Sequence, residues 1–210
     1  MKRLLAVLAL FALVGCAGPM TQTQSGQTIV DEWASVKAPP APVLKPVKSA
    51  PKETALLVLD LLKQNCGQRP RCVASVPKVQ RLLTEAREKG VLVVHAIFDP
   101  RTAADILPGV AARPGEPIVS SGPNKFLNTA LEKILKERGV KTVIVVGTAA
   151  EGAVLNTASE AALRGFRVIA PVDGASSANL YAEQYTAWHL ANSPRIGTQV
   201  TLTRSDLVGF

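Results

Sequence analysis

Short apolar runs alternate along the chain with longer segments in which apolar residues recur every three or four positions. This alternation predicts βαβ units and a parallel sheet. Six strands are expected, over Ala55–Leu59, Val91–Phe98, Pro117–Val119, Thr142–Val146, Arg167–Val172 and Gln199–Thr203. The pattern therefore predicts an α/β fold, a three-layer α/β/α sandwich whose mostly parallel, Rossmann-like sheet has six strands.

Four amphipathic helices are expected between these strands. The first presents Val76, Val79, Leu82, Leu83 and Ala86 on one face and stops at Gly90. The second carries Leu127, Leu131, Ile134 and Leu135 and stops at Gly139. The third is rich in small residues from Ala153 to its stop at Gly165, and the fourth runs from about Ala178 to Ala191 with Tyr181, Tyr185 and Trp188 on one side.

The start of the chain has the pattern of an export signal. Lys2 and Arg3 precede an apolar run, Leu4–Val14, that is too short for the ~20 residues of a membrane span and typical of a secretory signal peptide. The run ends Leu13-Val14-Gly15-Cys16, which resembles a bacterial lipobox. That resemblance implies that residues 1–15 are removed and that Cys16 is lipidated. Ala17 after it implies an outer-membrane protein of the cell envelope that faces the periplasm.

Residues 16–52 have a different composition from the rest of the chain. Thr, Gln, Ser and Gly come first, and five prolines follow between Pro39 and Pro51, without any apolar period. Such a stretch buries too little apolar surface to offset its chain entropy. We therefore expect a flexible tether over 16–52 and a folded domain over 53–210.

The basic charge does not by itself indicate a nucleic-acid partner. The formal net charge is +8, and Lys2 and Arg3 would leave with the signal peptide. The other cations alternate with Glu in stretches such as 85–89 and 133–138, as they do on solvated helix faces. We expect no nucleic-acid partner, membrane contact through the lipid anchor and a small-molecule ligand, and we leave a homo-oligomer open.

Polar residues follow the predicted strands at the edge where open α/β sheets bind ligands. Asp60 ends the first strand, and His95 lies late in the second. If the strand order is 3-2-1-4-5-6, Asp60 faces the turn at Thr148 and Ala149, and backbone N–H groups at the start of the third helix point at the same ligand.

Five segments together resemble one enzyme family over roughly residues 54–203. They are Ala55-Leu56-Leu57-Val58-Leu59-Asp60, Phe126-Leu127-Asn128-Thr129, Thr142-Val143-Ile144-Val145-Val146-Gly147-Thr148-Ala149, Thr157-Ala158 and Gly165-Phe166-Arg167-Val168. In order and spacing they resemble the isochorismatase-like hydrolases, which include isochorismatases, nicotinamidases and other cysteine hydrolases.

The resemblance implies an acid–base Asp at position 60, a Lys after the third strand and a nucleophilic Cys early in the third helix. The Lys position, six residues before Phe126, holds Ser120, and the Cys position, six after Gly147, holds Ala153. Alanine has no nucleophilic atom, so the covalent amidase route is closed and nicotinamidase activity is disfavoured. The isochorismatase branch of the family also lacks the Cys and is understood to protonate a vinyl ether from the Asp, so hydrolysis without a thiol stays open.

Two nearby residues have alternative interpretations. Lys125 could replace the missing cation, but a solvent-exposed residue near a helix start is the favoured interpretation. Glu151 could be an acid–base partner of Asp60, although a role at the positive end of the helix dipole is preferred. Without a cation beside it, a buried Asp60 should have a raised pKa, which suits a general acid and does not suit an ion pair.

The histidines and cysteines indicate no metal site and no cofactor. The chain has two His, and His95 lies within an apolar strand, where a core or pocket residue is more common than a ligand. Cys66 and Cys72 are expected to form a disulfide in an oxidising compartment, at the mouth of the crevice. The alternative is that Cys66 supplies the missing nucleophile.

Two functions remain in competition. The first is hydrolysis of a small molecule in the cell envelope by non-covalent acid–base chemistry at Asp60. The second is a pseudoenzyme that keeps the pocket for ligand binding or protein assembly.

The predicted anchor can be tested by Cys16→Ser. Serine offers no thiol for lipid attachment, so the variant should accumulate as an unlipidated precursor or soluble protein. Cell fractionation and intact mass measure this outcome, and a variant that still carries the lipid in the membrane fraction would contradict it.

Overall fold

The computed structural model describes residues 26–210, and the chain divides into two compact units, Met1–Pro39 and Pro40–Phe210. The described part of the first unit holds a short helix, α1 (Ile29–Glu32), and one 3-10 turn, η1 (Trp33–Ser35). Asp31 caps α1 by accepting hydrogen bonds from the backbone N–H and the hydroxyl of Thr28, at 2.8 and 2.9 Å. The predicted signal peptide and Cys16 lie outside the described residues.

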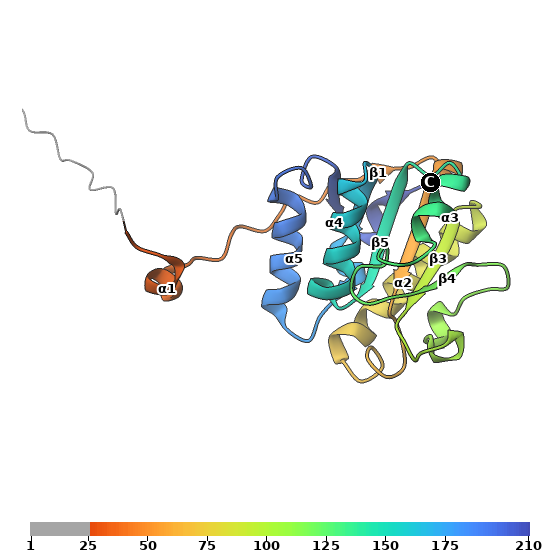
Figure 1. The fold of residues 1–210 in the computed structure, drawn as a ribbon, viewed down its shortest axis with the longest axis horizontal. Helices are drawn as coiled ribbons and strands as arrows, with labels where there is room; N and C mark the ends of the chain where they lie inside the picture. Colours follow the sequence, from red (N-terminus) through yellow and green to blue (C-terminus); the bar gives the residue numbers. More distant parts are fainter. Residues whose placement is uncertain (1–25) are drawn as a thin grey trace, which may run out of the picture. The chain divides into compact units, whose positions relative to one another are not determined.

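The second unit alternates strands and helices (Figure 1). Its strands are β1 (Val47–Lys48), β2 (Thr54–Leu59), β3 (Leu92–Ile97), β4 (Ile118–Ser120), β5 (Thr142–Thr148), β6 (Arg167–Pro171), β7 (Ala175–Ser176), β8 (Val200–Thr203) and β9 (Val208–Gly209). Its α-helices are α2 (Pro70–Glu88), α3 (Leu131–Glu137), α4 (Leu155–Leu163) and α5 (Leu180–Asn192). Short turns of 3-10 or π-helix connect them: η2 (Pro51–Glu53), η3 (Ala103–Asp105), η4 (Pro108–Val110), η5 (Ala150–Val154), η6 (Val172–Gly174) and η7 (Ser205–Leu207). No helix within residues 26–210 combines the length and the apolar character of a membrane span.

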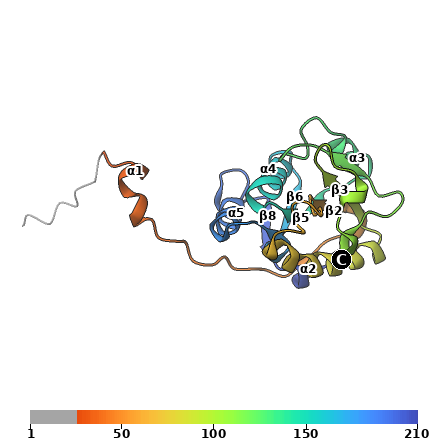
Figure 2. The same cartoon turned by 90° about the horizontal axis from the view of Figure 1, so that it is seen from below.

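The main sheet is parallel and runs β4-β3-β2-β5-β6-β8. This is the 3-2-1-4-5-6 order on which the expected position of Asp60 beside Thr148 depended. Figure 2 shows the sheet end-on, with α2 on one face and α3, α4 and α5 on the other. The predicted α/β/α sandwich is therefore confirmed.

The two central strands explain why the apolar runs in the sequence are continuous. Every residue of β2 and of β5 is buried, since helices cover both faces of a parallel sheet. On β2, Leu57 and Leu59 pack into the cluster under α3, α4 and α5, whereas Leu56 and Val58 pack against α2.

The sheet has more strands than the sequence predicted. The short strand β7 pairs with the end of β5, which makes seven strands in the main sheet. A second sheet joins β1 to β9. The three added strands have two residues each, which is too short to leave a periodic pattern in the sequence.

The folded unit begins at Pro40 and not near Glu53. The Lys45 N–H donates to the carbonyl of Leu202 at 3.2 Å, and the Ser49 N–H donates to that of Gly209 at 3.0 Å. Part of the proline-rich segment is therefore paired at a sheet edge and is not a free tether. Because proline is compatible with edge strands, its presence did not exclude this pairing.

The start of one helix also differs from the prediction. Helix α3 begins at Leu131, and Leu127 is exposed in the preceding turn. Side chains close that turn: the Phe126 N–H donates to Asn124 Oδ1 at 3.0 Å, and the Leu131 N–H to Thr129 Oγ1 at 3.1 Å. The third predicted helix opens with the π-helical turn η5, which contains Glu151, as expected.

Gly147 allows β5 to approach β2 where both strands end. Its φ is +135°, and a Cβ at this position would lie 2.0 Å from the carbonyl oxygen of Leu59. Only glycine fits this contact.

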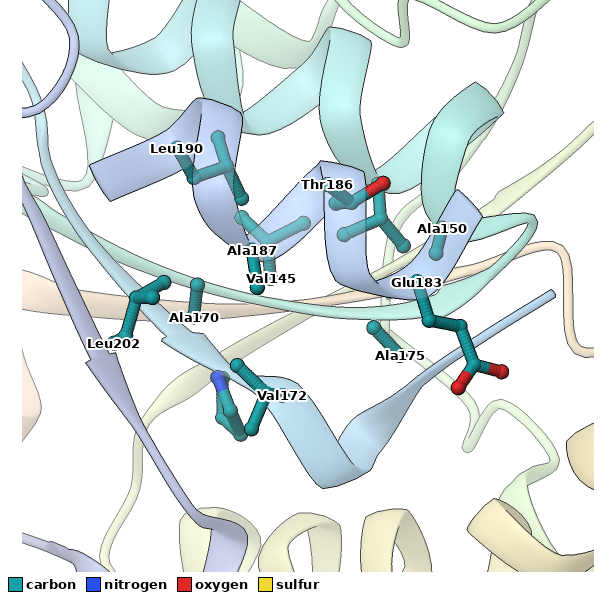
Figure 3. Close-up of a pocket in the computed structure, with 12 residues that line it drawn as sticks. Val145, Ala150, Ala170, Val172, Ala175, Glu183, Thr186, Ala187, Leu190 and Leu202 are labelled. Carbon is teal, nitrogen blue, oxygen red and sulfur yellow. The ribbon is translucent and has the colours of Figure 1, made fainter. Parts of the chain in front are cut away.

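A small cavity of about 20 Å³ lies between α5 and the sheet (Figure 3). Its walls are mostly apolar, with Ala187 and Leu190 facing Val145 and Leu202. Such a space holds no more than about one water molecule, so it is a packing gap and not a ligand site.

The structure joins Cys66 to Cys72, as the sequence predicted, and both side chains are fully buried. Because a cross-link over so few residues restricts the unfolded chain, the double variant Cys66→Ala/Cys72→Ala should lose about 2 kcal/mol of unfolding free energy. Urea unfolding with and without reductant measures this loss. Two free thiols in the oxidised wild type, or equal stability of both proteins, would contradict the prediction.

Candidate functional site

Asp60 lies at the carboxyl end of β2, in the middle of the sheet. Its φ is +53°, its N–H donates to the carbonyl of Ala96 on β3 at 3.0 Å, and its carbonyl accepts from the Leu62 N–H at 2.9 Å. On the other side Leu59 pairs with Gly147, so Asp60 and Thr148 come next along neighbouring strands. The residue is 6% exposed.

Lys125 is fully buried and forms an ion pair with Asp60. Its ammonium nitrogen Nζ lies 2.8 Å from Asp60 Oδ1, 3.1 Å from the carbonyl oxygen of Ile97 and 2.9 Å from that of Ser121. An ammonium group has three N–H donors, and all three are used here. Lys125 therefore holds the carboxylate of Asp60 and keeps no donor for a substrate.

Helix α4 fixes the backbone of Lys125. The Lys125 N–H donates to Thr157 Oγ1 at 3.2 Å, and the same hydroxyl donates to the carbonyl of Pro123 at 3.3 Å. Thr129 Oγ1 donates to the Lys125 carbonyl at 2.6 Å. These bonds close the turn so that the side chain runs back to the edge of the sheet.

The favoured interpretation of Lys125 as an exposed residue was wrong. Ser120, at the position implied by the resemblance, is exposed and donates to Asp99 Oδ1 at 2.7 Å. The count back from Phe126 gave Ser120 as the position of the cation, whereas the structure has the cation at Lys125, one residue before Phe126. The adjacency of Lys125 to Phe126, which is buried, was the one clue in the sequence.

The pKa of Asp60 is raised to about 6. Burial raises it, and the charge of Lys125 and its hydrogen bond oppose that rise. The predicted direction is confirmed, but the premise that no cation lies nearby was wrong. A buried carboxyl with this pKa is partly protonated near neutral pH and can also take part in an ion pair.

The second carboxyl oxygen of Asp60 differs from the first in its surroundings. Its atom Oδ2 has no hydrogen-bond partner among residues 26–210, and the Asp60 side chain is 8% exposed to solvent. Since Lys125 binds Oδ1, the proton of a neutral Asp60 belongs on Oδ2.

Thr148, Ala149 and Ala153 form the adjoining side of the site. Thr148 Oγ1 donates to the carbonyl of Ser176 at 2.9 Å, and the Thr148–Ala149 peptide bond is cis. Ala153 is buried one helical turn before Thr157, which contacts Lys125. The position expected for a thiol thus carries only a methyl group.

Glu151 is held on the other side of β5. Its Oε1 accepts from the Ser177 hydroxyl at 2.9 Å, and Ser177 follows β7. Because β2 and β7 flank β5 on opposite sides, the structure does not bring Glu151 together with Asp60.

His95 belongs to a separate cluster and does not line this site. Its Nε2 lies 3.1 Å from Glu116 Oε2, and Glu116 also pairs with Arg87. Burial lowers the pKa of His95. The partners lie toward the amino ends of the strands, away from Asp60.

The remaining candidates are clusters of metal ligands and the thiol of Cys66. Among residues 26–210 no three His, Cys, Asp or Glu side chains gather where they could hold a metal ion. Cys66 is bound to Cys72, so the alternative in which it is the nucleophile is contradicted.

Residues 54–204 of the chain match the Isochorismatase domain family. The chain is 31% identical over 154 residues to a streptothricin hydrolase of Streptomyces noursei, covering 67% of this chain. It is 30% identical over 111 residues to a secreted isochorismatase effector of Verticillium dahliae, covering 48% of this chain. The matches span 58% of the length of each of these relatives.

Solved structures share the fold. An isochorismatase-like hydrolase of Alkaliphilus metalliredigens superposes with a TM-score of 0.66 at 23% identity, over 73% of this chain and 95% of that one. The N-carbamoylsarcosine amidase of Thermoplasma acidophilum superposes with a TM-score of 0.63 at 22% identity, over 73% and 97%.

The raised pKa of Asp60 gives stability a specific pH dependence. The folded pKa of about 6 lies above the ordinary value of 3.8, so between these values the folded state binds more protons than the unfolded state. The contribution of Asp60 should therefore fall as pH rises from about 4 to about 6, by on the order of 2–3 kcal/mol.

Urea unfolding at several pH values isolates this contribution when wild type is compared with Asp60→Asn/Lys125→Met, which removes the whole pair. The difference in unfolding free energy should decline across that window and stay level above it. A difference that rises with pH would contradict the assigned pKa.

Proposed function

Because the chain belongs to the isochorismatase family of hydrolases, we propose that it hydrolyses a small molecule by non-covalent acid–base chemistry at Asp60. The main support for this proposal is the buried ion pair of Asp60 and Lys125, which leaves one carboxyl oxygen of Asp60 without a partner among the described residues.

Asp60 acts as the general acid. With a pKa of about 6, part of the Asp60 population is protonated near neutral pH and can donate a proton, whereas an ordinary exposed Asp is almost wholly ionised there. Lys125 is a positioning residue, because it touches only Asp60 and two carbonyls.

The substrate class that fits is an acid-labile vinyl ether. Asp60 Oδ2 gives its proton to the terminal carbon of the double bond, which leaves an oxocarbenium ion on the ether carbon. Water adds to that carbon and returns a proton to the Asp60 carboxylate. The resulting hemiketal breaks its bond to the ether oxygen and releases an alcohol and a ketone. No thiol is needed, in agreement with Ala153 at the helix start.

We place this activity in the cell envelope, on a lipid anchor at Cys16. The support is the order of positive charge, short apolar run and Cys at the start of the sequence, together with a buried disulfide.

Ala153 favours a second function, a pseudoenzyme that binds a ligand without turnover. In that case the pair of Asp60 and Lys125 has a structural role. Asp60→Asn should then lower the stability of the protein, because removal of one partner of the pair leaves the charge of Lys125 buried without compensation.

Asp60→Asn should reduce hydrolysis of isochorismate, used here as a vinyl-ether probe, by roughly 10²-fold or more. In the wild type kcat/KM should fall above pH 6, as Asp60 loses its proton, and iodoacetamide should have no effect. Stopped assays of product formation measure both results.

Glu88→Gln is the matched control, since Glu88 is an exposed carboxylate at the end of α2. Full activity of Asp60→Asn, or a trapped acyl-enzyme, would exclude the proposed mechanism. Absence of turnover with every vinyl ether tested, alongside measurable ligand binding, would favour the pseudoenzyme.

A further inference from the structure

A hollow of about 530 Å³ lies at the amino ends of β2, β3 and β4, the end of the sheet opposite to Asp60. Residues distant in sequence form its wall, including Lys52 before β2, Arg113 before β4 and Arg138 after α3. Its volume lies within the range of small-molecule sites, which is about 300–1,000 Å³.

The charge of the wall is strongly unbalanced. Four cations line it and Glu116 is the one acidic residue among the lining residues. Arg87 is already neutralised, because its Nε and Nη2 each donate to a Glu116 oxygen at 2.8 Å. Lys52, Arg113 and Arg138 form no ion pair with any residue of 26–210.

Glu116 cannot neutralise these three cations. Besides Arg87, its Oε2 accepts from the Arg113 N–H at 2.8 Å and lies 3.1 Å from His95 Nε2. Both oxygens are therefore occupied within the protein. The side chains of Lys52, Arg113 and Arg138 are left as an excess of three positive charges around one hollow.

The hollow is also held in shape by the backbone. The Glu116 N–H donates to the Arg113 carbonyl at 3.0 Å and closes a turn that contains Gly115 at a φ of +87°. Pro51, Pro114 and Pro117 lie in the wall, and proline rings fix φ. Little backbone ordering is left for a ligand to impose.

We propose that this hollow binds a ligand that carries phosphate groups. Two arginines provide planar forks that match phosphate oxygens in pairs, and Lys52 adds a third point charge. Like charges that repel one another in the free protein would be neutralised on binding. The site is independent of Asp60, so its occupation does not depend on turnover.

Phosphate groups could come from a soluble compound or from a phospholipid headgroup, and two probes distinguish them. Inorganic pyrophosphate is titrated calorimetrically at 150 mM NaCl, an ionic strength that screens weak surface attraction. Vesicles of phosphatidylglycerol, with phosphatidylcholine as the neutral reference, are tested by cosedimentation.

The test variant is Arg113→Gln/Arg138→Gln, and its matched control is Lys37→Gln/Lys133→Gln, which removes two exposed charges outside the hollow. Binding of one probe should weaken roughly tenfold or more in the test variant and remain unchanged in the control. The melting temperature without ligand should not fall, because neither arginine has an ionic partner to lose. Lys52→Gln gives an independent second variant if the double variant does not fold.

A soluble ligand is supported if the test variant, but not the control, loses binding of pyrophosphate. A lipid headgroup is supported if the test variant, but not the control, loses binding of vesicles and pyrophosphate does not bind. Binding of neither probe to the wild type, or equal loss in test and control variants, overturns the proposal.

Discussion

The burial of one carboxylate beside one ammonium group organises the carboxyl end of the central sheet. Asp60 ends a strand that is buried on both faces, and Lys125 is the largest of the fully buried side chains in residues 26–210. Desolvation of two charges costs several kcal/mol per ion, and the fold offsets that cost through direct pairing and through the carbonyls of Ile97 and Ser121. The turn after β4, the start of α4 and the end of β3 must therefore all meet at this point.

Such a buried ion pair adds little to the free energy of unfolding, but it fixes the orientation of the two side chains. Well-packed apolar residues would often fill the same space at no loss of free energy. An apolar pair, however, could not present a carboxyl oxygen with a raised pKa at the edge of a sheet. The saturated donors of Lys125 restrict its partner to one orientation, with Oδ1 held and Oδ2 free of partners in the described chain. The pair therefore fixes the geometry that the proposed acid–base chemistry needs.

Much of the fold could be predicted, because it depends on local periodicity and on the rules that govern parallel sheets. The mostly parallel sheet, the layers and the disulfide were confirmed, and Asp60 lies at the predicted edge. Elements without a period were missed: β1, β7 and β9 have two residues each and depend on partners distant in the chain. Helix α3 starts only at Leu131, because the side chains of Asn124 and Thr129 accept hydrogen bonds from backbone N–H groups of the preceding turn and so compete with helix formation.

The sequence by itself determined which chemistry is absent. Alanine at position 153 excludes a covalent thiol mechanism there, whatever the surrounding structure. Only the tertiary structure decided where the cations act. Lys125 reaches Asp60 across 65 residues of chain, and Lys52, Arg113 and Arg138 meet at the other end of the sheet. Lysine and arginine have long, flexible side chains that look alike in a sequence whether solvated or paired, and their partners are set by contacts that no local pattern records.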